Sequence, residues 1–285
     1  MKKTVTDFFE KEQIKLYSPI ECKDVYLRLP HILTRAGFAL PTEENTDKPS
    51  VKSLLCLCVP YFYGFPENFS VYAASPDYHT YYKALLERLC RCLCDAYPGY
   101  TFFGFADSSP FDEVSLCEKA GLGSRGDNML FLTEEYSSFV FLGEVATDMP
   151  YENWEWEPKS TPMLCTHCGA CKKACPGYEA DTFFCLSALT QKKGELTEKE
   201  INIIRKYGSA WGCDICQKVC PVTIKAQNNG SIHTPIDYFK NGRIEKLTRE
   251  LVESMDDEEF NTRAFSWRGR NTVLRNLKIL EKPEK

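Results

Sequence analysis

Eight cysteines between positions 165 and 220 have the types and spacing of ligands for iron–sulfur clusters. The first run reads C-x2-C-x2-C-x3-C-P, a second reads C-x2-C-x3-C-P, and one cysteine lies between them. In chain order the eight are Cys165, Cys168, Cys171, Cys175, Cys185, Cys213, Cys216 and Cys220. Eight thiolates are what two 4Fe–4S clusters require, and such clusters pass single electrons.

The spacing also predicts how the ligands divide. In two-cluster ferredoxins the last cysteine of the first run ligates the other cluster. One predicted ligand set is therefore Cys165, Cys168, Cys171 and Cys220. The other is Cys175, Cys185, Cys213 and Cys216.

Two other uses of these cysteines fit the sequence less well. Zinc also binds C-x2-C pairs, but four cysteines in one run with a second run nearby fit zinc poorly. A disulfide scaffold suits short secreted chains, whereas the start of this chain has two lysines with no apolar run behind them. No stretch approaches the ~20 apolar residues of a membrane span. We therefore expect a cytoplasmic protein in a reducing compartment, with no membrane partner.

The composition is that of a globular enzyme. The chain has 285 residues, 43% of them hydrophobic, and a formal net charge of −5. This length suggests one large or two ordinary domains. A modestly acidic chain lacks the general electrostatic footprint of a nucleic-acid binder, although a local basic patch is compatible with it.

The elements that must position the chemistry begin with a mixed domain over residues 1–150. Helices are predicted at 4–16 and 81–96, and strands at 53–60, 101–106 and 138–145. Strands separated by helices predict an α/β or α+β domain with a central sheet. Cys56 and Cys58 share one face of a predicted strand, where thiols behave as small buried hydrophobes.

A proline-containing linker at 149–162 leads to a ferredoxin-like domain with the two clusters, for which we predict residues 151–235. Within it, Thr197 and Glu200 form a capping box at the start of a helix. Residues 236–285 are predicted to be a short helical tail, in which Ile244, Leu247 and Leu251 recur at helical spacing.

Three polar segments of the first domain, at 72–79, 106–110 and 118–128, could form a cleft. Asp107 follows a predicted strand and precedes two serines and a proline, so it could project into that cleft or cap a helix. His79 could be a site residue or a hydrogen-bonded core histidine. The glycines of the third segment permit close backbone approach to a ligand, or simply shape turns.

In this order, ahead of the cysteine runs, these segments resemble the epoxyqueuosine reductase family. The resemblance covers most of the chain. Its motifs are D-Y-H at 77–79, D-S-x-P at 107–110, E-K-A-G-L-G at 118–123 with Asn128, F-L-G-E at 141–144 with Thr147 and Asp148, both cysteine runs with Cys185-Leu186-Ser187 between them, and Phe265 to Arg270 with Leu274-Arg275-Asn276.

The resemblance implies cobalamin in the first domain, in a fold related to reductive dehalogenases, together with two 4Fe–4S clusters. It implies reduction of epoxyqueuosine in the anticodon loop of tRNA to queuosine, with Asp107 as the catalytic acid and a low-potential donor such as ferredoxin or flavodoxin. To hold a proton near neutrality Asp107 would need burial beside the corrin, and Phe103, Phe105 and Phe111 flank it. The residues expected to contact the cofactor are Asp77, Tyr78, His79, Ser108, Ser109, Gly121, Gly123 and Asn128.

The chain departs from the family pattern in two places. Many members continue into a helical-repeat domain that helps to hold tRNA, whereas this sequence ends at Lys285, and Asp127 stands where a lysine is usual. The phosphate contacts that we expect, if they are not a solvated helix face, are Arg263, Arg268, Arg270 and Arg275. Two other functions stay open: a corrinoid iron–sulfur reductase of a small molecule such as an organohalide, and a non-enzymatic ferredoxin-like electron carrier.

Overall fold

The computed structural model describes residues 2–41, 43, 46–178 and 184–281. Contacts divide the chain into two compact units. The sheet unit comprises Met1–Pro60 and His79–His167, and the helical unit comprises Tyr61–Tyr78 and Cys168–Lys285. The division into domains at 1–150, 151–235 and 236–285 stays a prediction.

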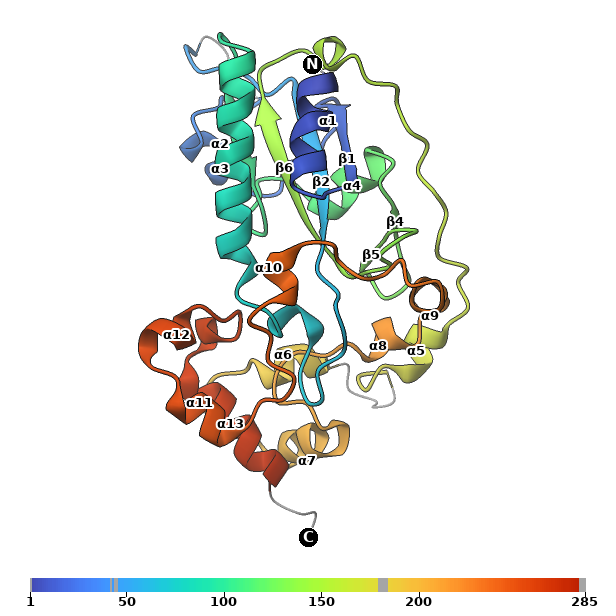
Figure 1. Cartoon of the computed structure of the whole chain (residues 1–285), viewed down its shortest axis with the longest axis vertical. Helices are drawn as coiled ribbons and strands as arrows, with labels where there is room; N and C mark the ends of the chain where they lie inside the picture. Colours follow the sequence, from blue (N-terminus) through green and yellow to red (C-terminus); the bar gives the residue numbers. More distant parts are fainter. Residues whose placement is uncertain (1, 42, 44–45, 179–183, 282–285) are drawn as a thin grey trace. The chain divides into compact units, whose positions relative to one another are not determined.

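The sheet unit is built on a four-stranded antiparallel sheet with the order β1-β2-β6-β3 (Figure 1). The strands are β1 (Leu16–Glu21), β2 (Ser53–Pro60), β3 (Phe102–Phe105) and β6 (Val140–Thr147). β2 is buried along its whole length, as expected for an apolar central strand. A second, two-stranded sheet pairs β4 (Ser124–Arg125) with β5 (Phe131–Leu132).

Short and long helices flank the larger sheet. They are α1 (Lys2–Lys11), α2 (Pro30–Arg35), α3 (Tyr78–Ala96), α4 (Glu113–Lys119) and the 3-10 turn η2 (Tyr151–Trp154). In Figure 1 the long α3 runs beside β6. A core between the sheet and α4 includes Cys56, Cys58, Phe111 and Cys117, which confirms the predicted packing of Cys56 and Cys58.

Most predicted elements of this unit are confirmed. The strand at 53–60 coincides with β2, and those at 101–106 and 138–145 correspond to β3 and β6 within two residues. The helix predicted at 4–16 is wrong at its end, because it stops at Lys11 and β1 begins at Leu16. β1 contains Pro19, which an edge strand tolerates because one side of its backbone needs no partner.

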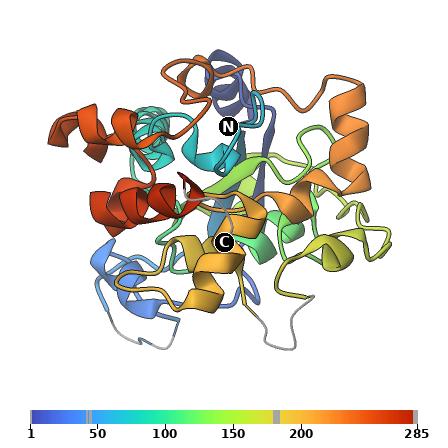
Figure 2. The same ribbon diagram turned by 90° about the horizontal axis from the view of Figure 1, so that it is seen from below.

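The helical unit consists of short helices (Figure 2). They are α5 (Ala170–Ala174), α6 (Leu186–Thr190), α7 (Glu198–Tyr207), α8 (Ile215–Lys218), α9 (Pro221–Asn228), α10 (Asp237–Lys240), α11 (Arg249–Ser254), α12 (Asp257–Asn261) and α13 (Arg270–Glu281), with 3-10 turns η1 (Val71–Ala73) and η3 (Ser266–Arg268). The capping box at Thr197 and Glu200 is confirmed.

The helical spacing of Ile244, Leu247 and Leu251 is misleading, because only Leu251 lies in a helix. The N–H of Ile244 donates to the carbonyl of Ala74 at 2.9 Å, and the N–H of Leu247 donates to Asn68 Oδ1 at 2.9 Å. Both apolar side chains still enter the core of this unit. No helix among the described residues is long and apolar enough to cross a membrane.

Candidate active site

Asp107 lies at the exit of β3, in a loop of the sheet unit. Its φ is +62°, a left-handed conformation that few non-glycine residues adopt and that often marks functional sites. Oδ2 of Asp107 lies 3.3 Å from Nε2 of His79, which stands in the first turn of α3. The possibility that Asp107 caps a helix is wrong, because Asp112 occupies the N-cap of α4.

The pair is open to solvent. The side chains of His79 and Asp107 are 51% and 58% exposed, so His79 is not a core histidine. Phe105 and Phe111 are buried in the core, while Phe103 is 43% exposed. The aromatic rings therefore do not by themselves give Asp107 apolar surroundings, and a bound ligand would have to supply them.

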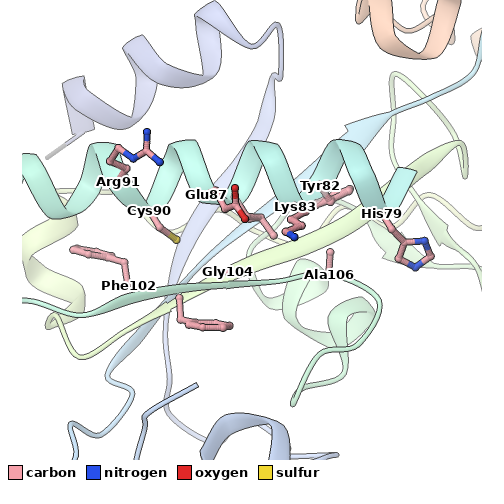
Figure 3. Close-up of a pocket in the computed structure, with 11 residues that line it drawn as sticks. His79, Tyr82, Lys83, Glu87, Cys90, Arg91, Phe102, Gly104 and Ala106 are labelled. Atoms are coloured by element: carbon pink, nitrogen blue, oxygen red, sulfur yellow. The ribbon is translucent and has the colours of Figure 1, made fainter. Parts of the chain in front are cut away.

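A groove begins beside this pair and runs between α3 and β3 (Figure 3). One wall carries His79, Lys83 and Arg91 at helical spacing on α3. The other wall is the backbone and rings of β3, including Phe102 and the exposed Phe103. The groove is lined mainly by apolar atoms, and it ends near Ala106, the residue before Asp107. It offers a concave apolar surface next to the exposed acid.

The other residues expected to contact a cofactor are not all gathered here. Ser108 is exposed beside Asp107, whereas Ser109 is 2% exposed and donates its hydroxyl to Glu144 Oε1. Asp77 and Tyr78 belong to the helical unit, where the N–H of Asp77 donates to Thr262 O at 2.8 Å.

The glycines of the third segment serve internal packing. A Cβ on Gly121, where φ is +68°, would lie 2.5 Å from Cβ of Lys159. A Cβ on Gly123 would lie 2.1 Å from the carbonyl oxygen of Leu132. Asn128 Oδ1 accepts from the N–H of Leu130 at 3.2 Å. Close approach of the chain to itself therefore accounts for both glycines.

Asp127, which stands where the family usually has a lysine, has a partner within the sheet unit. Asp127 Oδ1 lies 2.8 Å from Nδ1 of His167, and the same nitrogen lies 4.0 Å from Sγ of Cys165. His167 adopts a left-handed backbone, with φ of +53°. The acid thus contacts the first cysteine run through His167, rather than facing solvent alone.

Within the helical unit, the part of the first cysteine run that begins at Cys168 lies close to the second run. Helix α5, which contains Cys171, packs on α8, which contains Cys216. Burial, together with smaller contributions from the neighbouring Asp214, Cys185 and Cys175, raises the pKa of Cys213 to about 11. Such a group of thiols becomes a set of thiolate ligands only when a metal supplies the compensating positive charge. The donors therefore fit an iron–sulfur cluster.

Asp214 stabilises the second cysteine run from within. The side chain is 5% exposed and lies between Cys213 and Cys216. Its carboxylate accepts the Ser70 hydroxyl at 2.5 Å and the Val71 N–H at 2.8 Å. The net effect of burial and these bonds leaves its pKa raised. Asp214 thereby joins the cysteine loop to η1, a contact that the sequence analysis did not anticipate.

The arginines of the tail differ from the expectation that they are free for phosphate. Arg263 donates to Gly242 O at 2.6 Å, Arg270 to Val252 O at 2.5 Å, and Arg275 to Gly194 O at 2.5 Å. Carbonyls of the helical unit therefore engage three of the four. Arg268 instead stacks 3.6 Å from the ring centroid of Trp267, which is 56% exposed.

Sequence reasoning did not single out Glu113, which opens α4 and accepts the N–H of Asp107 at 2.9 Å. Burial raises its pKa to about 8. The available signal was an acidic residue in the first turn of the helix that follows the Asp107 loop.

The cysteine runs and most of the chain match known proteins. Residues 162–181 and 207–223 match the family model of the 4Fe-4S binding domain, so this part of the chain is an iron–sulfur domain. Epoxyqueuosine reductase of Listeria monocytogenes serovar 1/2a is 33% identical over 222 residues, which are 72% of this chain and 54% of the relative. The chain thus spans about half the length of that relative.

Epoxyqueuosine reductase of Gloeobacter violaceus is 30% identical over 224 residues, which are 74% of this chain and 69% of the relative. A crystal structure of epoxyqueuosine reductase with an epoxyqueuosine-modified tRNA-Tyr stem loop shares the fold. The TM-score is 0.69 at 21% identity, over 98% of this chain and 80% of that one. The chain belongs to the epoxyqueuosine reductase family.

Proposed function

We propose that this chain is an oxidoreductase that reduces the epoxide of epoxyqueuosine in tRNA to queuosine. Its relatives in Listeria and Gloeobacter carry the name of this activity. The observation that carries the proposal is Asp107, an exposed acid in a left-handed turn, 3.3 Å from His79.

The reaction removes the epoxide oxygen as water, which takes two electrons and two protons. Asp107 donates a proton to the departing oxygen as a general acid. His79 is close enough to orient the Asp107 carboxyl group. A ligand bound in the adjacent groove would cover the acid and exclude water, which favours its protonated form.

Two 4Fe–4S clusters, when bound, would supply the electrons one at a time. One set of ligands is Cys165, Cys168, Cys171 and Cys220, and the other is Cys175, Cys185, Cys213 and Cys216. The shared surroundings of Cys213, Cys175 and Cys185 support the second set. A low-potential ferredoxin or flavodoxin is the proposed donor.

Cobalamin is the proposed second cofactor, with a cobalt centre that, when bound and reduced, supplies a strong nucleophile. The apolar groove beside Asp107 and the exposure of that acid fit a large flat ligand. Within the sheet unit, His79 and Ser108 present their side chains for such contacts. Asp77, Tyr78, Gly121, Gly123 and Asn128 remain proposed contacts from the family resemblance, as does Ser109.

A tRNA anticodon loop is the proposed substrate, as in the relative solved with a modified stem loop. The exposed Trp267, stacked with Arg268, offers an aromatic face and a cation of the kind that unstacked RNA bases contact. A cytoplasmic location follows from this proposal, because the tRNA resides there.

The test is turnover of tRNA that carries epoxyqueuosine. The full chain is purified without oxygen, reconstituted with iron and sulfide, supplied with cobalamin and a chemical reductant, and assayed by mass spectrometry of released nucleosides. Cobalamin-dependent queuosine supports the proposal. If clusters and cobalamin are bound but no queuosine forms, the activity is wrong, and reduction of a small epoxide or organohalide by the same preparation would identify the alternative function.

A further inference from the structure

The loop from Asp107 to Phe111 has an unfavourable backbone conformation, so neighbouring groups must hold it in place. Asp107 has a φ of +62°, and the N–H of Ser108 bonds back to Ala106 O at 2.7 Å in a tight turn. A left-handed non-glycine residue persists only where its surroundings fix it. The groups that contact this loop therefore help to determine where the Asp107 side chain points.

Two carboxyl groups hold the loop from the side of the core. Glu113 Oε1 accepts the N–H of Asp107 at 2.9 Å. Glu144 Oε1 accepts the hydroxyl of Ser109, whose Oγ in turn accepts the N–H of Phe111 at 2.9 Å. Asp107 and Ser109 are thus each fixed by an acid from a different element, α4 and β6.

Glu144 occupies a position where packing alone would favour an apolar residue. It is 1% exposed, in the middle of the sheet, between Cys56 of β2 and Phe105 of β3. Its Oε2 is buried and has no hydrogen-bond partner among the described residues. Burying such a group is unfavourable. A carboxyl kept there at this cost indicates a use beyond filling the core.

The geometry points to Glu113 and Glu144 as positioning residues for Asp107. They fix the 107–111 loop at two points. Asp107 thereby keeps its left-handed backbone conformation and directs its carboxyl toward His79 and the groove. This inference rests on the proposed function in one respect, since it takes Asp107 as the proton donor. Neither glutamate touches the substrate in this scheme.

The deciding comparison is Glu113→Ala against Glu113→Gln in the full-length, cluster-loaded chain. The alanine variant removes the acceptor of the Asp107 N–H, while the glutamine variant keeps a carbonyl oxygen at the same reach. Hydrogen–deuterium exchange, resolved to the Asp107 amide by fragmentation, should be about tenfold faster in Glu113→Ala, as expected for loss of a hydrogen bond to such an acceptor. It should stay near the wild-type rate in Glu113→Gln.

Turnover gives the second readout. We expect kcat for queuosine formation to fall about tenfold in Glu113→Ala, with KM for tRNA unchanged and most activity restored in Glu113→Gln. Wild-type exchange at Asp107 in the alanine variant would overturn the inference. So would a glutamine variant as impaired as the alanine variant.

Asp148→Ala is the matched control, because Asp148 Oδ1 accepts the N–H of Thr101 at 2.7 Å, just before β3 begins. It should accelerate exchange at Thr101 but leave exchange at Asp107 and kcat unchanged.

The role of Glu144 is tested with Ser109→Ala, which removes the loop hydroxyl that Glu144 binds, because Glu144→Ala would open a cavity in the core. Faster Asp107 exchange is expected there, and wild-type exchange would exclude Glu144 from the positioning role.

The exchange measurement requires no turnover. If the wild-type chain forms no queuosine, the proposed function fails, while the exchange of the Asp107 amide still decides whether the two glutamates hold the loop.

Discussion

Nε2 of His79 lies 3.3 Å from Oδ2 of Asp107, although 51% and 58% of these side chains are exposed. A polar contact this open to water contributes little to folding, at most about 1 kcal/mol even when His79 is protonated. The two residues come from α3 and from the loop after β3, so only the packing of α3 on the sheet brings them together. A contact with so little structural value fits a functional role.

Asp107→Asn should abolish queuosine formation, with kcat reduced at least about a hundredfold, because the amide cannot donate the proton as an acid. The iron content, the visible spectrum and cobalamin binding should match the wild type, since Asp107 lies outside the predicted cluster ligands. Mass spectrometry of tRNA nucleosides measures the product. Wild-type rates in this variant would show that another group protonates the oxygen.

His79→Ala should lower kcat about tenfold, because the Asp107 carboxyl loses a hydrogen-bonding partner. Its unfolding temperature should stay within a degree or two of the wild type, because both side chains are solvent-exposed. Thr80→Ala, at the next and exposed position of α3, is the matched control. Equal activity of the two variants would show that His79 has no role in the site.

Cys185→Ser should remove one of the two clusters. Cys185 is near enough to Cys213 to help raise the pKa of its thiol, and a serine oxygen is a poor substitute for a thiolate on iron. Iron analysis should give about four irons per chain instead of about eight. Cys94→Ser, which replaces an exposed cysteine of α3, should retain the full content. Full iron in Cys185→Ser would require a different eighth ligand.

Glu144→Gln should flatten the dependence of stability on pH. Burial, reinforced by Glu113, raises the pKa of Glu144 well above its ordinary value of 4.5, and the pKa of Glu113 is raised to about 8. Both carboxyls therefore hold protons in the folded chain where the unfolded chain has released them. Their stabilising effect is fully present below the unfolded pKa and is lost as pH rises through the folded values.

The free energy of unfolding should thus fall between about pH 5 and about pH 8, by up to about 1.4 kcal/mol per pH unit for one such group. Glutamine cannot ionise, so the variant should lose part of this slope. Unfolding temperatures measured across this range, at constant ionic strength, test it. An unchanged slope would mean that Glu144 is ionised in the folded chain.

Arg268→Ala should weaken tRNA binding several-fold and reduce the salt dependence by about one phosphate contact. The guanidinium stacks on exposed Trp267 instead of bonding a carbonyl as its neighbours do. Arg35→Ala, an exposed arginine of α2, should leave the affinity unchanged. Equal effects of the two substitutions would indicate non-specific charge only.

Features that depend on local spacing could be predicted from the sequence. The cysteine runs, the buried strand β2 and the capping box at Thr197 could all be predicted, because each involves residues a few positions apart. The strand β1 was missed because Pro19 and the adjacent Ser18 conceal its pattern. Its place is fixed by pairing with β2, which begins more than thirty residues later.

Which polar residues act together depends on how distant segments pack against one another. Asp107 could have been a helix cap until α4 was seen to begin after Asp112. In the sequence Glu144 is only the last residue of the motif at 141–144, whereas the folded sheet places it next to Ser109. The tail arginines were expected to contact phosphates, yet three of them bond distant carbonyls. Hydrogen bonds between remote segments leave no local pattern, because any residue with the right atom at the right place can make them.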